Sequence, residues 1–211
     1  MNRFLVSALH LRRAAALALA AVMAFALAAA PLGAQMKGLV RQGNLDELVT
    51  HASLIFSGKI LGVRSEPHPQ YPKALTVVIT VRVTDTLKGQ PGTEYTFRSL
   101  VGGAVDFRSQ FGYKPGEEVF LMLTRPSELG LSSPIGLDQG RFRVVTNEQG
   151  TRLLVNGYGN AGLFKGMDTS ASKFDGLSAG QKLRIATHQS GPIAETELKD
   201  MIRALVTAGS Q

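Results

Sequence analysis

The most regular hydrophobic pattern in the chain lies between Leu75 and Thr84. A two-residue period places alternate side chains on opposite faces of a β-strand. The pattern therefore predicts a strand with Arg82 on its solvent side and with one buried aliphatic face, formed by Leu75, Val77, Ile79, Val81 and Val83.

Further apolar runs between turn-forming residues predict strands at 54–63, 94–101, 118–124, 141–146 and 151–156. Gly58 and Gly62 interrupt the first of these runs, and glycine inside a strand predicts a bulge or a close backbone approach. The last two runs flank a four-residue turn, which is typical of a hairpin. The proline-rich segment 67–72 cannot form a regular ladder, because proline has no N–H, so we expect an extended connection there.

One helix is expected before these strands and one after them. Asn44 is a good N-cap, and Glu47 follows three residues later, as in a capping box. Near the C-terminus, apolar residues recur at helical spacing from Leu198 to Val206. Alternating strand and helix units are missing, which favours a mainly β fold: a small antiparallel OB-like barrel with a short N-terminal helix and a C-terminal helix.

The first 34 residues have the pattern of an export signal. Three arginines precede an apolar, Ala-rich stretch over 14–30, and no acidic residue occurs before Asp46. We expect cleavage near Ala34, which predicts a periplasmic or secreted protein without a stable membrane anchor. The alternative is a retained anchor, although about 17 apolar residues are short for a membrane span.

The remaining residues, 35–211, are expected to form a single domain. We expect the barrel over about 44–156, a glycine-rich loop region over 157–193 and the C-terminal helix over about 194–207. The chain has no cysteine, so neither disulfides nor an N-terminal lipidated cysteine are expected.

The charge balance is ordinary for a soluble domain. Without the signal, 20 of the 23 basic residues remain against 16 acidic ones. No basic run is interleaved with aromatic residues and tryptophan is absent, so a nucleic acid is not an expected partner.

Motifs for catalysis or cofactor binding are incomplete. Glycines from Gly157 to Gly162 match G-x-G-x-x-G, but no helical pattern follows and no acid stands at the required distance. No two of His51, His68 and His188 have metal-ligand spacing. We therefore expect no cofactor, no metal and no catalytic residue. A small hydrolase that uses His51 or His68 is an alternative hypothesis.

Aromatic side chains are a better indication of binding. The candidate binding loop contains Phe107, Arg108, Phe111 and Tyr113. Aromatic residues together with arginine are typical of interface anchors. The alternative is that these rings fold back and complete the core. Another hypothesis is a sheet face that binds an oligosaccharide or polymer through Arg82 and Tyr95.

The order of segments also resembles a known module. Its features are Leu45 to Gly62, the alternating strand that ends in Leu87-Lys88-Gly89, the pair Gly102-Gly103, and the run from Pro115 to Leu121. This pattern, over roughly 44–145, is similar to uncharacterised exported bacterial proteins and to the netrin-like module of tissue inhibitors of metalloproteinases. The resemblance implies an OB-type barrel and an exported peptidase as partner.

Those inhibitors place an N-terminal cysteine on the catalytic zinc of the peptidase, and this chain has no cysteine. No inhibitory residue is therefore carried over from the resemblance. We expect a non-catalytic exported binding module that engages or inhibits an exported peptidase or another protein.

Overall fold

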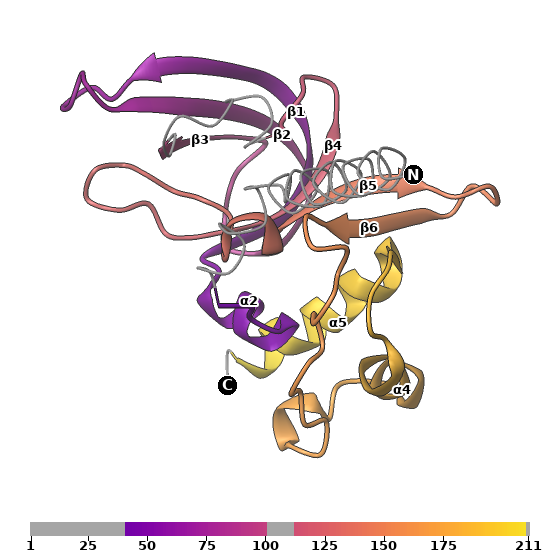
Figure 1. Ribbon diagram of the computed structural model, residues 1–211. Helices are drawn as coiled ribbons and strands as arrows, with labels where there is room; N and C mark the ends of the chain where they lie inside the picture. The colour runs from indigo at the N-terminus through magenta and orange to yellow at the C-terminus, as the bar shows by residue number, and fades with distance from the viewer. Residues whose placement is uncertain (1–40, 101–111, 210–211) are drawn as a thin grey trace, which may run out of the picture. The chain divides into compact units, whose positions relative to one another are not determined.

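The computed structural model describes residues 41–100 and 112–209. Its centre is a seven-stranded sheet of order β3-β2-β1-β4-β5-β6-β7, in which all neighbours are antiparallel (Figure 1). The strands are β1 (Leu54–Pro67), β2 (Leu75–Lys88), β3 (Glu94–Leu100), β4 (Glu118–Leu123), β5 (Arg141–Thr146), β6 (Arg152–Asn156) and β7 (Ile193–Ala194). The mainly β, antiparallel fold is confirmed. The sheet ends at β3 and β7 and is not closed into the expected barrel.

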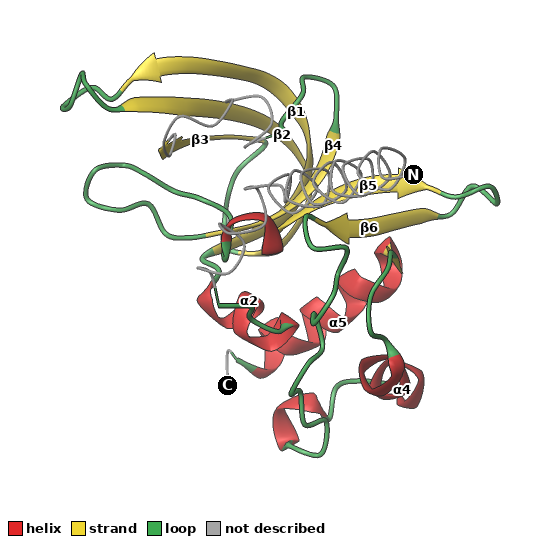
Figure 2. Cartoon of the chain, viewed as in Figure 1, coloured by secondary structure: helices red, strands yellow, loops and turns green. Residues whose placement is uncertain are grey.

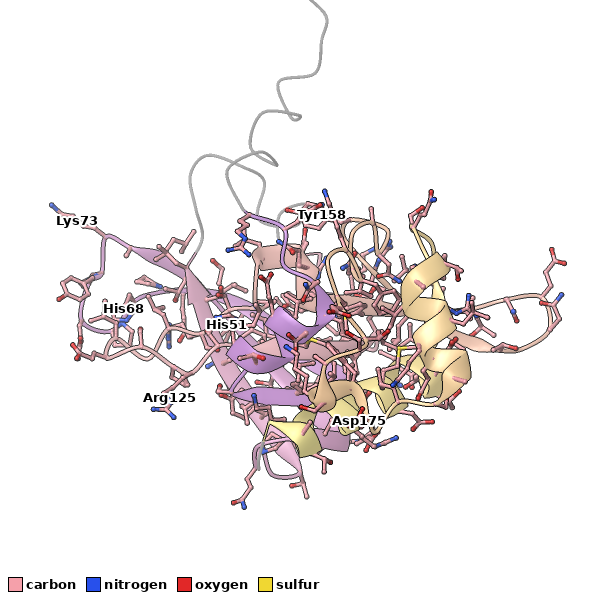
Figure 3. The ribbon with its side chains drawn as sticks, turned by 90° about the horizontal axis from the view of Figure 1, so that it is seen from below. His51, His68, Lys73, Arg125, Tyr158 and Asp175 are labelled. Atoms are coloured by element: carbon pink, nitrogen blue, oxygen red, sulfur yellow. The ribbon has the colours of Figure 1, made fainter. Side chains whose placement is uncertain are left out.

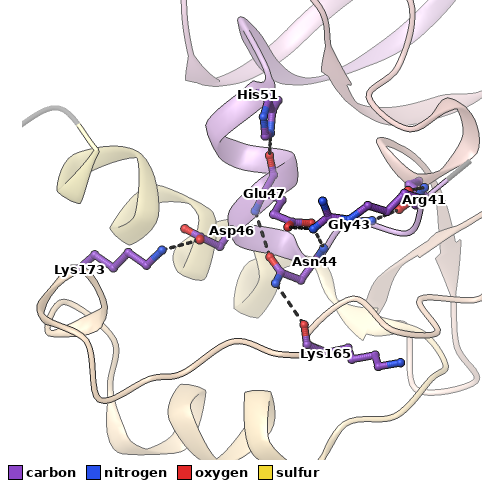
Figure 4. A network of polar contacts seen from close by, with 9 residues as sticks. Arg41, Gly43, Asn44, Asp46, Glu47, His51, Lys165 and Lys173 are labelled. Carbon is purple, nitrogen blue, oxygen red and sulfur yellow. Dashed lines mark hydrogen bonds and ion pairs between the residues drawn. The ribbon is translucent and has the colours of Figure 1, made fainter.

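Helices α2 (Leu45–His51), α4 (Ala179–Thr187) and α5 (Glu195–Ala208) lie on one side of the sheet (Figure 2). The expected capping box opens α2: the Asn44 side chain accepts from the Glu47 N–H, and the Glu47 side chain accepts from the Asn44 N–H (Figure 4). Asn44 also donates to the carbonyl of Lys165 at 3.1 Å, and this bond holds the start of α2 against a segment far along the chain. The short N-terminal helix and the C-terminal helix are thus both confirmed.

Strand β4 contributes side chains to two hydrophobic cores. Residues 119–123 are all buried, and their side chains alternate between the two faces of the sheet. On one face is the inner core, formed by Phe56, Ile60, Val77, Ile79, Val81, Phe97, Tyr113, Val119, Leu121 and Leu123. On the other is the helix-side core, in which Ile55, Phe120, Met122, Phe142 and Leu154 of the sheet meet Leu45, Leu48, Leu198, Met201 and Ile202 of α2 and α5.

The alternation predicted for β2 is confirmed only in part, because Val78, which the pattern places on the solvent side, is also buried. Val77, Ile79 and Val81 are buried as expected, whereas Leu75 is 47% exposed. Thr76, which was expected to face solvent, is buried. Its hydroxyl donates to the carbonyl of Glu66 at 2.7 Å and accepts from Arg98 at 2.7 Å, so the polar group remains paired.

Both glycines of β1 lie at irregularities of the ladder, as predicted. The register between β1 and β2 shifts between Ser57 and Gly58 and again between Ile60 and Gly62. At Gly58 the two strands approach closely, because an added Cβ would lie 2.5 Å from the carbonyl oxygen of Arg82. At Gly62 an added Cβ would have no neighbour within 4 Å.

The region 157–193 is not the continuous loop that its glycine content suggested. Residues 157–166 form turns with no helix directly after Gly162, but α4 follows at Ala179. A second capping box starts this helix, in which Ser178 and Gln181 exchange hydrogen bonds. Ile185 then anchors α4 to the helix-side core.

An ion-pair network fixes α5 to the sheet. Glu195 accepts from Arg152 of β6 at 2.6 Å and pairs with Lys199 at 2.7 Å, and Lys199 reaches Asp85 of β2 at 3.1 Å. Burial acts to raise the pKa of Glu195, but the hydrogen bonds from Lys199 and Arg152 together outweigh it. The pKa of this carboxyl is therefore lowered from its usual value.

The close approach at Gly58 generates a prediction with a matched control. Gly58→Ala should lower the free energy of unfolding by about 1–3 kcal/mol, because the new methyl group would overlap backbone atoms of β2. Gly62→Ala, in the same strand and at a similar bulge, should change it by less than about 0.5 kcal/mol. Urea unfolding measures both values, and equal losses in the two variants would contradict the packing described.

The Glu195 network generates a prediction on pH. Because the pKa of Glu195 is lowered from 4.5 in the folded state, its ion pairs stabilise the protein above about pH 4.5. This contribution is lost as the pH falls through the folded-state pKa. Glu195→Gln should reduce the free energy of unfolding at pH 7 by about 1–3 kcal/mol. It should also make this free energy fall less as the pH is lowered. Glu148→Gln, at an exposed turn, serves as the control, and an unchanged acid profile in Glu195→Gln would refute the assignment.

Candidate functional site

A pocket of about 500 Å³ opens where the ends of β3 and β5 meet the loop that follows β4. This volume is typical of sites for small ligands. Its lining consists of Ser99, Leu100, Tyr113, Ser127, Leu131, Ser132, Ser133, Pro134, Leu137, Asp138 and Arg141. Most of these residues lie in the stretches 99–100, 131–134 and 137–138. The second stretch belongs to the 124–136 loop, so the backbone of this loop helps to determine the shape of the pocket.

The 124–136 loop is fixed to the sheet at three points. The Ser132 N–H donates to the carbonyl of Arg98 in β3 at 2.8 Å, and an isolated bridge pairs Leu123 with Pro134. His68, beyond the end of β1, contacts the carbonyl of Leu129 through Nε2 at 2.9 Å. The pocket wall is therefore held in place by bonds to β3, to β4 and to the β1–β2 connection.

Leucine side chains form the rim of the pocket. Leu100 is 49% exposed and Leu137 is 59% exposed. Leu137 also has a φ of 59°, a left-handed conformation that leucine rarely adopts. Such strain persists only where the surrounding structure enforces it, and it often accompanies function.

Arg141 is the main charged group of the pocket. Leu121 of the inner core is its partner on β4, so Arg141 lies on the inner face of the sheet, whereas its neighbour Phe142 belongs to the helix-side core. Only 12% of its side chain is exposed. Its Nε lies 3.4 Å from Asp138, and the guanidinium carbon lies 4.8 Å from the centroid of the Tyr113 ring.

The guanidinium of Arg141 has unused donors. An arginine carries five N–H donors, and buried polar groups are normally hydrogen-bonded. Within 41–100 and 112–209, the contact with Asp138 is the only ion pair of Arg141, and no side-chain hydrogen bond occupies its terminal nitrogens. The two terminal nitrogens of the guanidinium therefore have no hydrogen-bond partner among the described residues.

Tyr113 contributes a second unpaired group. Its ring packs edge-on against Phe97 in the inner core, and its buried hydroxyl has no partner among the described residues. Burial is the main cause that raises the pKa of Tyr113 far above its usual range, while the charge of Arg141 acts in the opposite direction. The hydroxyl therefore keeps its proton at neutral pH and can act as a donor.

The structure places one of the four residues of the expected binding loop. Tyr113 lines the pocket and also completes the inner core, as in the alternative interpretation of that loop. Phe107, Arg108 and Phe111 lie outside the described residues. Arg82 and Tyr95 are not brought together: Tyr95 is partnered with the core residue Val81, whereas Arg82 lies opposite Glu94 on the other face.

The three histidines lie in separate elements. His51 ends α2 and contacts the carbonyl of Glu47 at 2.7 Å, and Figure 3 shows it apart from His68. His68 is buried, and its second nitrogen, Nδ1, accepts from the Gln70 N–H at 3.2 Å. Both ring nitrogens of His68 are thus engaged. His188 caps α4 and packs edge-on against Phe164, and burial lowers its pKa.

Sequence reasoning missed Arg141, Asp138 and Leu137. Arg141 opens a predicted strand, where a charged residue ordinarily lies on the solvent side. Its burial follows from pairing with β4, which the local pattern does not reveal. The available signal was Gly136 before Leu137 and Asp138, which indicates a tight turn leading directly into β5.

Comparisons of the chain with protein families, with curated proteins and with solved structures gave no match. No three His, Cys, Asp or Glu side chains in the described part of the chain are grouped so that they could hold a metal ion. In the same residues, no helix has the length and apolar character needed to cross a membrane. The case for function therefore depends on the geometry of the pocket.

The unpaired hydroxyl of Tyr113 generates a prediction on stability. Tyr113→Phe should leave the free energy of unfolding unchanged or raise it by up to about 1 kcal/mol, because a buried polar group is removed without the loss of a hydrogen bond. Thermal and urea unfolding measure the change. Thr76→Val is the contrasting variant, since it removes a buried hydroxyl that has two partners and should be destabilising. A clear loss of stability in Tyr113→Phe would show that the hydroxyl is bonded.

Proposed function

We propose that this protein is a non-catalytic exported binding module, and that the pocket between β3, β5 and the 124–136 loop receives a segment of an exported protein partner. The observation that carries the proposal is the largely buried side chain of Arg141, whose terminal nitrogens have no hydrogen-bond partner among the described residues, within a pocket lined by exposed leucines. Guanidinium donors that the protein does not use are available to a ligand of opposite charge.

The composition of the pocket supports binding of a protein rather than a sugar. Exposed Leu100 and Leu137 make the rim apolar, and arginine is enriched at protein interfaces. Arg82 and Tyr95 lie on opposite faces of β2 and β3, so they do not form one platform for a sugar ring. The engaged nitrogens of His68 argue against its use as a general base.

The finer fold assignment is part of the same proposal. We propose that β1 to β4 are an OB-like half in which residues 131–134 take the place of the closing strand. Two isolated bridges support it: a parallel one between Arg98 and Leu131, and an antiparallel one between Leu123 and Pro134. The resemblance to the netrin-like module agrees with this arrangement, and export with cleavage near Ala34 agrees with the N-terminal sequence.

Site-specific photo-crosslinking tests the proposed function. A benzophenone amino acid replaces Leu100 at the rim of the pocket in one sample, and Leu183 on α4 in the other. Both leucines are exposed, but only Leu100 lines the pocket. After irradiation with the exported fraction of the producing cells, we expect crosslinked proteins from position 100 only.

A second substitution links the crosslink to the pocket. Leu137→Asp, combined with the crosslinker at position 100, should cut the yield about tenfold, because it replaces an apolar rim group by a charge. Aspartate tolerates the left-handed φ of this position better than most residues. Equal yields at positions 100 and 183, or a yield that Leu137→Asp does not affect, would overturn the proposal.

A further inference from the structure

The charged group of the pocket indicates which chemical class of ligand it binds. The terminal nitrogens of Arg141 form a planar fork, which matches the two oxygens of a carboxylate. In the ion pair with Asp138, Nε lies 3.4 Å from the carboxylate, and no hydrogen bond among the described residues occupies the terminal nitrogens. The ring of Tyr113 forms part of the pocket wall beside this guanidinium. An anionic, two-oxygen acceptor would satisfy the groups that the protein itself leaves unpaired.

The walls of the pocket require an apolar group next to that anion. Leu100, Leu131, Pro134 and Leu137 surround the opening, and two of them are largely exposed. Covering these side chains contributes about 25 cal/mol of favourable hydrophobic free energy for each Å² of apolar surface removed from water. The ligand therefore combines a carboxylate with an aliphatic or aromatic side chain close to it.

Strand β3 offers a means of recognising a peptide backbone. The carbonyl of Arg98 accepts from Ser132 on the side of β3 that faces away from β2. Backbone groups of an antiparallel strand alternate between its two sides, so Leu100, two residues later, presents its N–H and C=O to the same outer side. None of the hydrogen bonds outside the sheet in the described residues uses them. An extended peptide binds to such an edge by adding a strand.

We infer that the pocket binds the C-terminal end of an extended peptide from the partner protein, with the terminal carboxylate on Arg141 and an apolar last side chain among Leu131, Pro134 and Leu137. This inference rests on the proposed function and specifies the part of the partner that is bound. The last residue supplies the carboxylate and the apolar group at once, and the residues before it pair with the edge of β3 at Leu100.

Two peptide pools test the inference. Each consists of hexapeptides with five random positions and leucine at the end; one pool has a free C-terminal carboxylate and the other a C-terminal amide. Affinity selection with mass spectrometry on the full protein should retain free-acid peptides about tenfold more strongly than amides, since the carboxylate supplies the charge-assisted bonds. Equal retention of the two pools, or no retention of the acids, would overturn the inference.

Variants assign the effect to the fork of Arg141. Arg141→Gln should abolish the preference for free acids, and Arg141→Lys should restore only part of it, because lysine keeps the charge but not the bidentate geometry. Arg143→Gln is the matched control: it removes the same charge two residues along β5, from an exposed side chain, and should leave the preference intact. Urea unfolding checks that each variant is folded. If Arg141→Gln unfolds, Leu137→Asp replaces it and should weaken the free acids by repulsion.

Two further outcomes separate the inference from the proposed function. Sodium decanoate carries a carboxylate and an apolar chain but no peptide backbone; if it binds in an Arg141-dependent way while no peptide does, the ligand is an amphiphile and the inference is wrong. The residue of the partner that is crosslinked from position 100 provides the other criterion. A crosslink that maps to an internal segment refutes the inference and leaves the proposed function standing, whereas a crosslink near the C-terminus supports both.

Discussion

Burial of β4 on both faces is the constraint on which the rest of the structure depends. Five consecutive side chains of this strand are withdrawn from water, and each contributes about 1.5–3 kcal/mol when fully buried. Because neighbouring side chains face opposite ways, this burial requires both the inner core and the helix-side core. Helices α2 and α5 cover one face, while β1, β2 and β3 enclose the other. The pocket lies at the margin of the inner core, where Tyr113 closes it.

Local rules account for the elements that the sequence predicted well. The capping box at Asn44, the two-residue period of β2, the bulges at Gly58 and Gly62 and the β5–β6 hairpin all depend on neighbours within a few residues. Helix α4 escaped notice because glycine dominates its surroundings, although its Ser178 and Gln181 cap follows the same rule as that of α2. Closure into a barrel was not confirmed, and it depends on which strand edges meet, which no local pattern reveals.

The candidate site was harder to predict because its residues meet only through long-range pairing. Leu100 is separated by some 40 positions from Asp138 and Arg141, and β4 with the loop that follows it brings them together. Tyr113 was one of the residues expected in a binding loop, and its place in the core depends on contacts with Phe97 and Arg141, which lie far along the chain. The histidines were candidates for a catalytic site by residue type alone. The hydrogen bonds of His51 and His68 indicate structural roles for these two.

The shortness of β7 has a consequence for how copies of this protein behave toward one another. Its two residues pair with Leu153 and Leu154 of β6, and the chain then turns at once into α5. A helix placed at the last strand prevents another copy from extending the sheet there, which is a common route to aggregation. At the opposite margin, the bond from Ser132 to Arg98 covers part of the outer edge of β3. Addition of a strand from another copy is thus hindered by a helix at one end of the sheet and by the 124–136 loop at part of the other.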